Sequence, residues 1–189
     1  MKLNMRKLIL LFISFSIMAA AGLHAQGKFY TKTGRISFYS STAMENIEAI
    51  NKSVVTLLDT KTGDLQFVVL VKGFEFRKAL MQEHFNKEYA ETDIYPRAEF
   101  KGSISNNASI NYAANGKNNV TVKGKLTIHG VTKDVETNGT IEVKDGKPVI
   151  HSVFNILLAD YKITIPRLYR DNISSTIRIT VDGSLEPLK

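Results

Sequence analysis

Apolar and polar residues alternate with a period of two along most of the chain. The pattern is clearest in residues 176–182 (TIRITVD), and residues 98–104 and 120–128 repeat it. Successive side chains of a β-strand point to opposite faces, so this alternation indicates strands with one buried and one exposed face. The number of such stretches predicts an all-β fold, and no linker between them marks a second domain.

Two stretches depart from this alternation because apolar residues occupy both odd and even positions. They are residues 65–71 (LQFVVLV) and residues 149–158 (VIHSVFNILL). A strand that is apolar on both sides is expected to be covered on both sides. We therefore expect a helix or a neighbouring segment to pack on the outer face of each.

One segment, residues 77–89 (RKALMQEHFNKEY), is typical of a helix because it contains good helix formers and neither Gly nor Pro. Leu80, Met81, His84 and Phe85 follow a helical spacing, which predicts that their side of the helix packs against the sheet. Regular short strands with one interrupting helix indicate an antiparallel barrel or a sandwich. The pattern alone does not separate these two architectures.

Glycine-containing turns separate the predicted strands. Asp145-Gly146 supplies the positive φ angles that a tight hairpin requires. Asn138-Gly139 has two interpretations, because it either divides one strand into two or marks a bulge inside a single strand. Gly130 is expected at the turn of a hairpin, in a backbone conformation that a β-carbon disfavours.

The first 25 residues have the order of features that is typical of a secretory signal peptide. Three basic residues precede an apolar run over residues 8–21, and small residues follow it. The run is shorter than the roughly 20 apolar residues of a transmembrane helix, so an uncleaved anchor is the less favoured interpretation. We expect cleavage after Ala25, with Ala21 as the second choice, and a single exported domain over residues 26–189.

Charge and composition narrow the class of partner. Residues 1–25 hold three of the 25 basic residues and none of the 18 acidic ones, so the formal charge of the remaining chain is +4 rather than +7. Its lysines are spread singly along the predicted strands instead of forming one basic face, which argues against a nucleic-acid partner. The chain has no cysteine, so one hydrophobic core must hold the domain together without disulfides.

Three stretches of the chain carry recognisable motifs. Residues 84–102 (HFNKEYAETDIYPRAEFKG) combine the end of the predicted helix, a YP turn and a strand. Residues 124–135 (GKLTIHGVTKDV) form a hairpin motif, and residues 154–163 (FNILLADYKI) place Tyr161 at a late aromatic position. In this order the three stretches resemble the YceI family. The resemblance implies an extended lipocalin-like antiparallel β-barrel of about eight strands with one short helix packed against it.

The resemblance also implies a function. Proteins of this family are exported, so we expect a periplasmic or secreted protein that holds a polyisoprenoid or similar long apolar ligand in the barrel interior, without a stable membrane anchor. The full chain holds seventeen aromatic residues (seven Tyr and ten Phe), and several gather around the predicted helix, although periodicity alone favours a filled core. The alternative is a periplasmic stress-response or interaction module with a packed core and no physiological ligand. The oligomeric state stays open, a homodimer included.

The candidate ligand site divides into an apolar lining and a polar mouth. The predicted lining residues are Phe74, Phe76, Leu80, Phe85, Tyr89, Phe100, Phe154 and Tyr161. The residues predicted to meet a polar headgroup at the mouth are His84, Asn86, Arg167 and Arg170. For His84 a structural role in helix packing is favoured over ligand contact, since a lone helical histidine carries little information.

We predict no catalytic residue, no metal and no cofactor, and hence not an enzyme. The three histidines after residue 25, His84, His129 and His151, form no compact metal-binding motif, and for His129 a backbone hydrogen bond is the expected role. The chain contains no G-x-S-x-G sequence that would place a serine nucleophile on a sharp turn. A thiol nucleophile is excluded by the lack of cysteine.

Overall fold

A computed structural model describes residues 27–188, and the predicted signal peptide and the expected cleavage site before Gln26 lie outside this range. The strands are β1 (Lys28–Ser41), β2 (Asn46–Asp59), β3 (Asp64–Leu70), β4 (Glu75–Phe76), β5 (Arg97–Ile104), β6 (Gly116–Ile128), β7 (Val131–Lys144), β8 (Lys147–Leu157), β9 (Thr176–Ser184) and β10 (Glu186–Pro187). Among the described residues, no helix has the length and apolar character needed to cross a bilayer.

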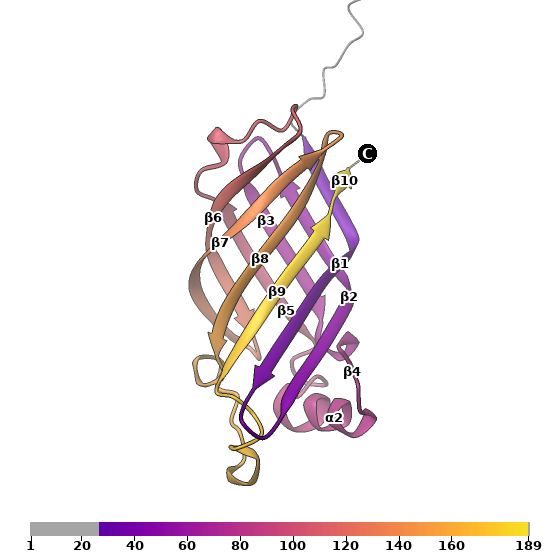
Figure 1. The fold of residues 1–189 in the computed structure, drawn as a ribbon, viewed down its shortest axis with the longest axis vertical. Helices are drawn as coiled ribbons and strands as arrows, with labels where there is room; N and C mark the ends of the chain where they lie inside the picture. The colour runs from indigo at the N-terminus through magenta and orange to yellow at the C-terminus, as the bar shows by residue number, and fades with distance from the viewer. Residues whose placement is uncertain (1–26, 189) are drawn as a thin grey trace, which may run out of the picture.

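Eight of these strands form a closed antiparallel barrel (Figure 1). The order β1-β9-β8-β7-β6-β5-β3-β2 is closed by a further antiparallel pairing between β1 and β2. The short strands β4 and β10 add to β2 and β1. Because every barrel strand has a neighbour on both sides, the structure is a barrel and not a sandwich, and the expected fold is confirmed.

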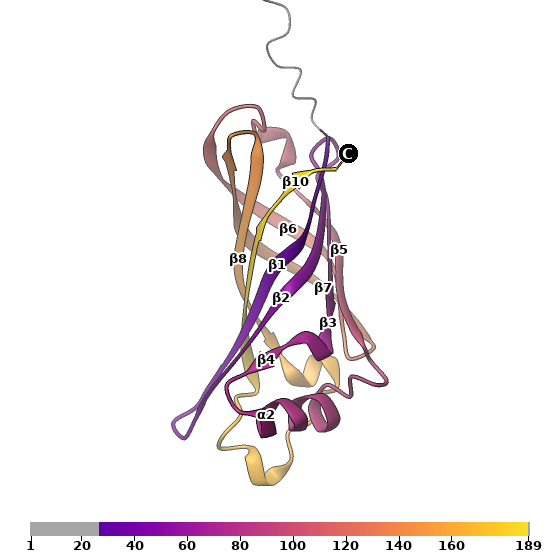
Figure 2. The ribbon, with the colours of Figure 1, turned by 90° about the vertical axis from the view of Figure 1, so that its right-hand side faces the viewer.

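The two ends of the barrel differ, and we name them by their connections. The closed end holds the β2–β3 and β7–β8 turns and the β5–β6 connection, whereas the mouth end holds the β1–β2 turn, the predicted helix and the β8–β9 loop (Figures 1 and 2). The helix consists of α2 (Ala79–His84) followed by one π-helical turn, η3 (Phe85–Tyr89), which confirms the predicted helical segment.

The helix covers a part of the barrel where strand pairing is incomplete. β2 pairs with β3 only over Val55–Leu58, and nearer the mouth end its partner on that side is the two-residue strand β4. The chain between β3 and β5 therefore leaves the sheet and supplies α2 and η3 at this position (Figure 2). The interruption gives the barrel a wall at the mouth end that is made of side chains from a helix.

The glycine turns confirm one expectation and resolve one ambiguity. His129-Gly130 and Asp145-Gly146 connect paired strands with two successive positive φ angles, as tight hairpins require. Asn138-Gly139, in contrast, lies inside β7 in continuous register with β6, so it is neither a turn nor a bulge, and the pairing of β7 with β8 ends at Gly139. A Cβ at Gly139 would lie 2.7 Å from the His151 carbonyl oxygen, and this close approach of two backbones explains the glycine.

The closed end is filled by a dense apolar core. Leu58 and Leu185 have no exposed surface, and Ile141 and Val143 are 1% exposed. The connection between β5 and β6 folds over this core with its buried Tyr112, whose hydroxyl donates a 2.8 Å hydrogen bond to the Asn107 Oδ1. Burial raises the pKa of Tyr112 to about 12. At neutral pH the uncharged Tyr112 side chain therefore fills the space above this core.

The expected cover on the outer faces of the two doubly apolar strands is absent from the described residues. Leu70 on β3 is 58% exposed, and Val153 and Leu157 on β8 are 45% and 49% exposed. A closed barrel buries only the inward residues, so the outward ones face solvent whatever their polarity. Their β-branched or aliphatic side chains favour the strand itself, and this preference misled the prediction of a covering element.

Candidate functional site

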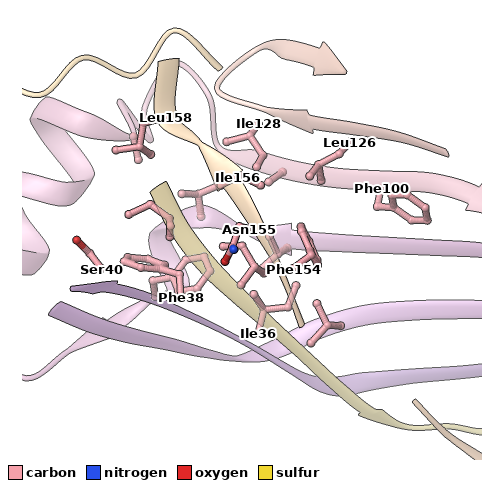
Figure 3. Close-up of a pocket in the computed structure, with 18 of the residues that line it drawn as sticks. Ile36, Phe38, Ser40, Phe100, Leu126, Ile128, Phe154, Asn155, Ile156 and Leu158 are labelled. Atoms are coloured by element: carbon pink, nitrogen blue, oxygen red, sulfur yellow. The ribbon is translucent and has the colours of Figure 1, made fainter. Parts of the chain in front are cut away.

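A cavity of about 730 Å³ occupies the barrel interior between the closed-end core and the mouth end (Figure 3). Its wall is built from residues of all eight barrel strands and of β4, together with α2, η3 and the β8–β9 loop. Figure 3 shows Phe38, Phe100, Leu126 and Phe154 projecting into it from four different strands. The period of two along each strand places apolar side chains on this inner surface, so the wall is predominantly hydrocarbon.

Four phenylalanines form the wall nearest the helix. The centroid of the Phe38 ring on β1 lies 5.2 Å from that of Phe74, 5.7 Å from that of Phe76 and 5.4 Å from that of Phe85. The rings of Phe76 and Phe85 are 5.0 Å apart. These tilted and edge-on arrangements are the ones that aromatic pairs prefer. The cluster fixes η3 against the barrel and presents ring surface to the cavity.

Phe100 is positioned by a pair of glycines on neighbouring strands. Gly102 on β5 lies directly opposite Gly124 on β6. A Cβ on Gly102 would collide with the Lys123 carbonyl oxygen and would lie 2.6 Å from the Phe100 ring. The ring therefore lies over a patch of bare backbone, which allows it to turn along the wall instead of filling the interior.

Polar groups gather where the cavity reaches the mouth end. Ser40 is 2% exposed, and its Oγ accepts a 2.9 Å hydrogen bond from the Ser174 amide. Glu45 lies in the β1–β2 turn, where its Oε1 accepts from Lys78 Nζ at 3.2 Å and its Oε2 accepts from Asn172 Nδ2 at 3.5 Å. One carboxylate thus joins the turn, the start of the helix and the β8–β9 loop around the opening.

His129 holds a second junction at the same end. Its Nδ1 lies 3.2 Å from the Tyr161 carbonyl oxygen, its Nε2 lies 2.7 Å from Glu91 Oε2, and its ring centroid is 4.3 Å from that of Tyr95. Both ring nitrogens lie within hydrogen-bonding distance of an oxygen atom, so the ring is held from two sides. The expected backbone hydrogen bond of His129 is confirmed. The junction brings together all three stretches that carried the family resemblance.

Most of the predicted apolar lining lies in the cavity wall. The residues that line it are Phe74, Phe76, Phe85, Tyr89, Phe100 and Phe154. Leu80 is 62% exposed on the outer side of α2, and Tyr161 is 2% exposed within the core beside Leu126 and Ile156. Burial, and secondarily the Asp160 charge, raises the pKa of Tyr161. Neither Leu80 nor Tyr161 is part of the wall.

The predicted polar mouth is only partly brought together. His84 lines the cavity, whereas Asn86, Arg167 and Arg170 do not. The backbone carbonyl of Asn86 accepts a 2.9 Å hydrogen bond from the Thr92 amide, which ties the residue to its own loop.

Leu168 and Tyr169, which lie between these two arginines in the sequence, line the cavity instead of them. In this irregular loop the sequence offers no period from which the direction of a side chain follows.

The N-terminal part of the site was missed by the sequence analysis. Ile36, Phe38 and Ser40 on β1 and Glu45 in the following turn all line the cavity. The signal for the first three was their spacing of two residues, which places them on one face of a strand. Glu45 carried no such signal, because its position depends on contacts with two segments far away in the sequence. Among residues 27–188, no group of three or more His, Asp or Glu side chains could hold a metal ion.

A closed eight-stranded antiparallel barrel with an apolar interior of ligand size defines a lipocalin-like barrel. The model of the YceI-like domain matches residues 12–185, so this chain belongs to the YceI family. No curated protein matches the sequence.

Solved structures share the fold at low sequence identity. A polyisoprenoid binding domain from Saccharophagus degradans, implicated in plant cell wall breakdown, is 18% identical with a TM-score of 0.76, over 86% of this chain and 99% of that one. Burkholderia cenocepacia BcnA is 19% identical with a TM-score of 0.67, over 81% of this chain and 96% of that one. A Campylobacter jejuni YceI protein is 18% identical with a TM-score of 0.54, over 72% and 81%.

Proposed function

We propose that this protein binds a polyisoprenoid or similar long apolar lipid inside the barrel, after export to the periplasm or beyond. The observation that carries the proposal is the apolar cavity of about 730 Å³ in the barrel interior. Protein interiors are packed as densely as organic crystals and contain few voids larger than a water molecule. A cavity of this size therefore argues against the alternative of a module with a packed core.

The chemistry of the wall favours a hydrocarbon chain over a polar metabolite. The volume of the cavity falls within the range of about 300–1,000 Å³ that is usual for small-molecule sites. Each methylene that moves from water into such a site contributes about 0.8 kcal/mol, so a long chain gains affinity without needing many polar contacts. Three of the polar groups that line the cavity, Ser40, Glu45 and His84, lie toward the mouth end, where a headgroup would reside. Further polar residues of β7 and β8 line one side of the cavity.

The relatives support the same ligand class, and binding instead of catalysis. The Saccharophagus degradans domain with the same fold is described as polyisoprenoid binding. The order of basic, apolar and small residues in residues 1–25 supports export. For this chain, we infer that the half-buried carboxylate of Glu45 serves to join the mouth segments, because both of its oxygens contact other side chains.

The test is native mass spectrometry of protein extracted without detergent from its own host. We expect a lipid adduct on the wild-type protein and an increase of the thermal midpoint when a long polyprenyl lipid is added to stripped protein. Ala98→Phe, which places a ring inside the cavity, should abolish both effects while the barrel stays folded.

The matched control is Ala114→Phe, the same change at an exposed position in the β5–β6 connection. It should keep the adduct and the midpoint increase. If the wild-type protein carries no lipid and its midpoint does not respond to any polyprenyl lipid, the ligand-free interaction module becomes the better hypothesis.

A further inference from the structure

The most exposed large apolar side chains of the described residues gather at the mouth end. Met44, Leu80, Ile94 and Leu168 are 72%, 62%, 66% and 79% exposed. They belong to four separate segments, namely the β1–β2 turn, α2, the loop before β5, and the short helix η6 (Arg167–Tyr169) in the β8–β9 loop. Figures 1 and 2 show the turn, α2 and the β8–β9 loop forming the same end of the molecule. Isolated exposed apolar residues are common, but a group around one opening indicates a contact surface.

This surface is continuous with the cavity. Leu168 is both the most exposed of the four and a part of the cavity wall, next to Tyr169. An apolar path therefore leads from the barrel interior to the outer tip of the β8–β9 loop. A lipid that follows this path leaves the cavity between the same segments that carry the exposed apolar residues.

Unpaired arginines flank the apolar tips. Leu168 lies between Arg167 and Arg170, and Arg77 precedes Leu80 by three residues. None of these three arginines forms an ion pair with a described residue. Apolar side chains next to basic ones are the combination by which peripheral proteins bind the interface of an anionic bilayer.

We infer that the mouth end docks on an anionic lipid bilayer, with Met44, Leu80 and Leu168 inserted at the interface and the arginines at the phosphates. This inference rests on the proposed lipid ligand, because docking here brings the cavity opening to the surface from which a lipid would be taken or delivered. It also gives roles to Leu80, Arg167 and Arg170 outside the cavity wall. Glu88 and Asp171 offset part of the positive charge, so the preference for anionic over neutral bilayers should be about fivefold.

The experiment is co-sedimentation of the exported protein with vesicles of phosphatidylcholine alone and of phosphatidylcholine with 30% phosphatidylglycerol. The mass of the preparation is measured first, because a retained apolar run at residues 8–21 would itself bind vesicles. The test variant is Met44→Ser/Leu80→Ser, since neither residue lines the cavity. We expect it to weaken vesicle binding by about tenfold or more. Its binding of a short water-soluble prenyl alcohol, measured without vesicles, should be unchanged.

The matched control is Val55→Ser/Leu188→Ser, which removes two exposed apolar side chains away from the mouth end, one on β2 where it pairs with β3 and one directly after β10. It should bind vesicles as the wild type does. Equal losses in both variants, or wild-type protein that binds the prenyl alcohol but no vesicle, would overturn the docking inference and leave the proposed function intact. A change of the oligomeric state in the test variant, with vesicle binding unaltered, would also overturn it and assign the surface to a second copy of the chain. Wild-type protein that binds neither vesicle nor prenyl alcohol would overturn both proposals.

Discussion

The closed end and the mouth end are built from the same eight strands, yet one is solid and the other is hollow. At the closed end, aliphatic residues such as Leu58 and Leu185 are completely buried, and the β5–β6 connection seals them. At the mouth end, Phe38, Phe76 and Phe85 are only partly buried and surround open space. The comparison indicates that the two ends have different roles. The buried residues of the closed end stabilise the barrel, whereas the looser packing at the mouth end leaves room for a ligand.

The largest effect is expected from a cavity made in the closed end. Leu58→Ala should lower the free energy of unfolding by about 3–5 kcal/mol, because Leu58 has no exposed surface and its neighbours are densely packed. Urea denaturation measures this loss. The midpoint increase caused by a polyprenyl lipid should be the same as in the wild type, since Leu58 does not line the cavity. A small loss of stability here would mean that the closed end is not the solid part of the barrel.

A somewhat smaller effect is expected from the hairpin that reaches the mouth end. Gly130 has a φ of +71°, and a Cβ there would lie 2.6 Å from the Tyr95 ring, which itself packs on His129. Gly130→Val should therefore cost about 2–3 kcal/mol through backbone strain and the displaced ring. The measurement is again a urea titration. Gly116→Val serves as the control, because an added Cβ at that position meets open space, and an equal loss in both variants would contradict the prediction.

A Phe→Ala substitution at each end tests directly whether the mouth end is less densely packed than the closed end. Phe85→Ala at the mouth end should cost about 1–2 kcal/mol in ligand-free protein, because its ring already faces a cavity. Phe29→Ala at the closed end, where Phe29 is 8% exposed, should show the full penalty of about 3–5 kcal/mol.

Only Phe85→Ala should also reduce the midpoint increase caused by a polyprenyl lipid. Equal penalties without any lipid response would show that the two ends are packed alike.

The smallest effect concerns the seal of the closed end and its dependence on pH. The folded-state pKa of Tyr112 is raised by burial from about 10 to about 12. The neutral phenol is therefore favoured by folding, so its contribution is fully present below about pH 10 and is lost as the pH rises toward 12.

Tyr112→Phe should cost about 1 kcal/mol at pH 8 through the lost hydrogen bond to Asn107. Its unfolding free energy should fall less steeply between pH 10 and 12 than that of the wild type. Parallel pH profiles would disprove the role of the buried phenol.

The sequence alone determined the class of fold and much of the cavity wall. A strand exposes alternate residues to one side, so the period-two pattern of residues 98–104 predicted an inward Phe100, and helical spacing predicted a shared face for His84 and Phe85. All three residues line the cavity. Turn chemistry placed Gly130, because few residues other than glycine accept its backbone angles. These properties depend only on neighbours in the chain, and for that reason they can be read from the chain.

Tertiary structure decided whether the interior is filled and how the mouth is assembled. The volume left between inward side chains depends on how far the closed barrel opens, and no local pattern records it. The mouth depends on contacts between segments that lie 30 or more residues apart. Glu45 contacts Lys78 and Asn172, and His129 contacts Glu91 and Tyr161. The directions of Leu80 and Leu168 were decided in the same way, because each depends on where the whole helix or loop rests against the barrel.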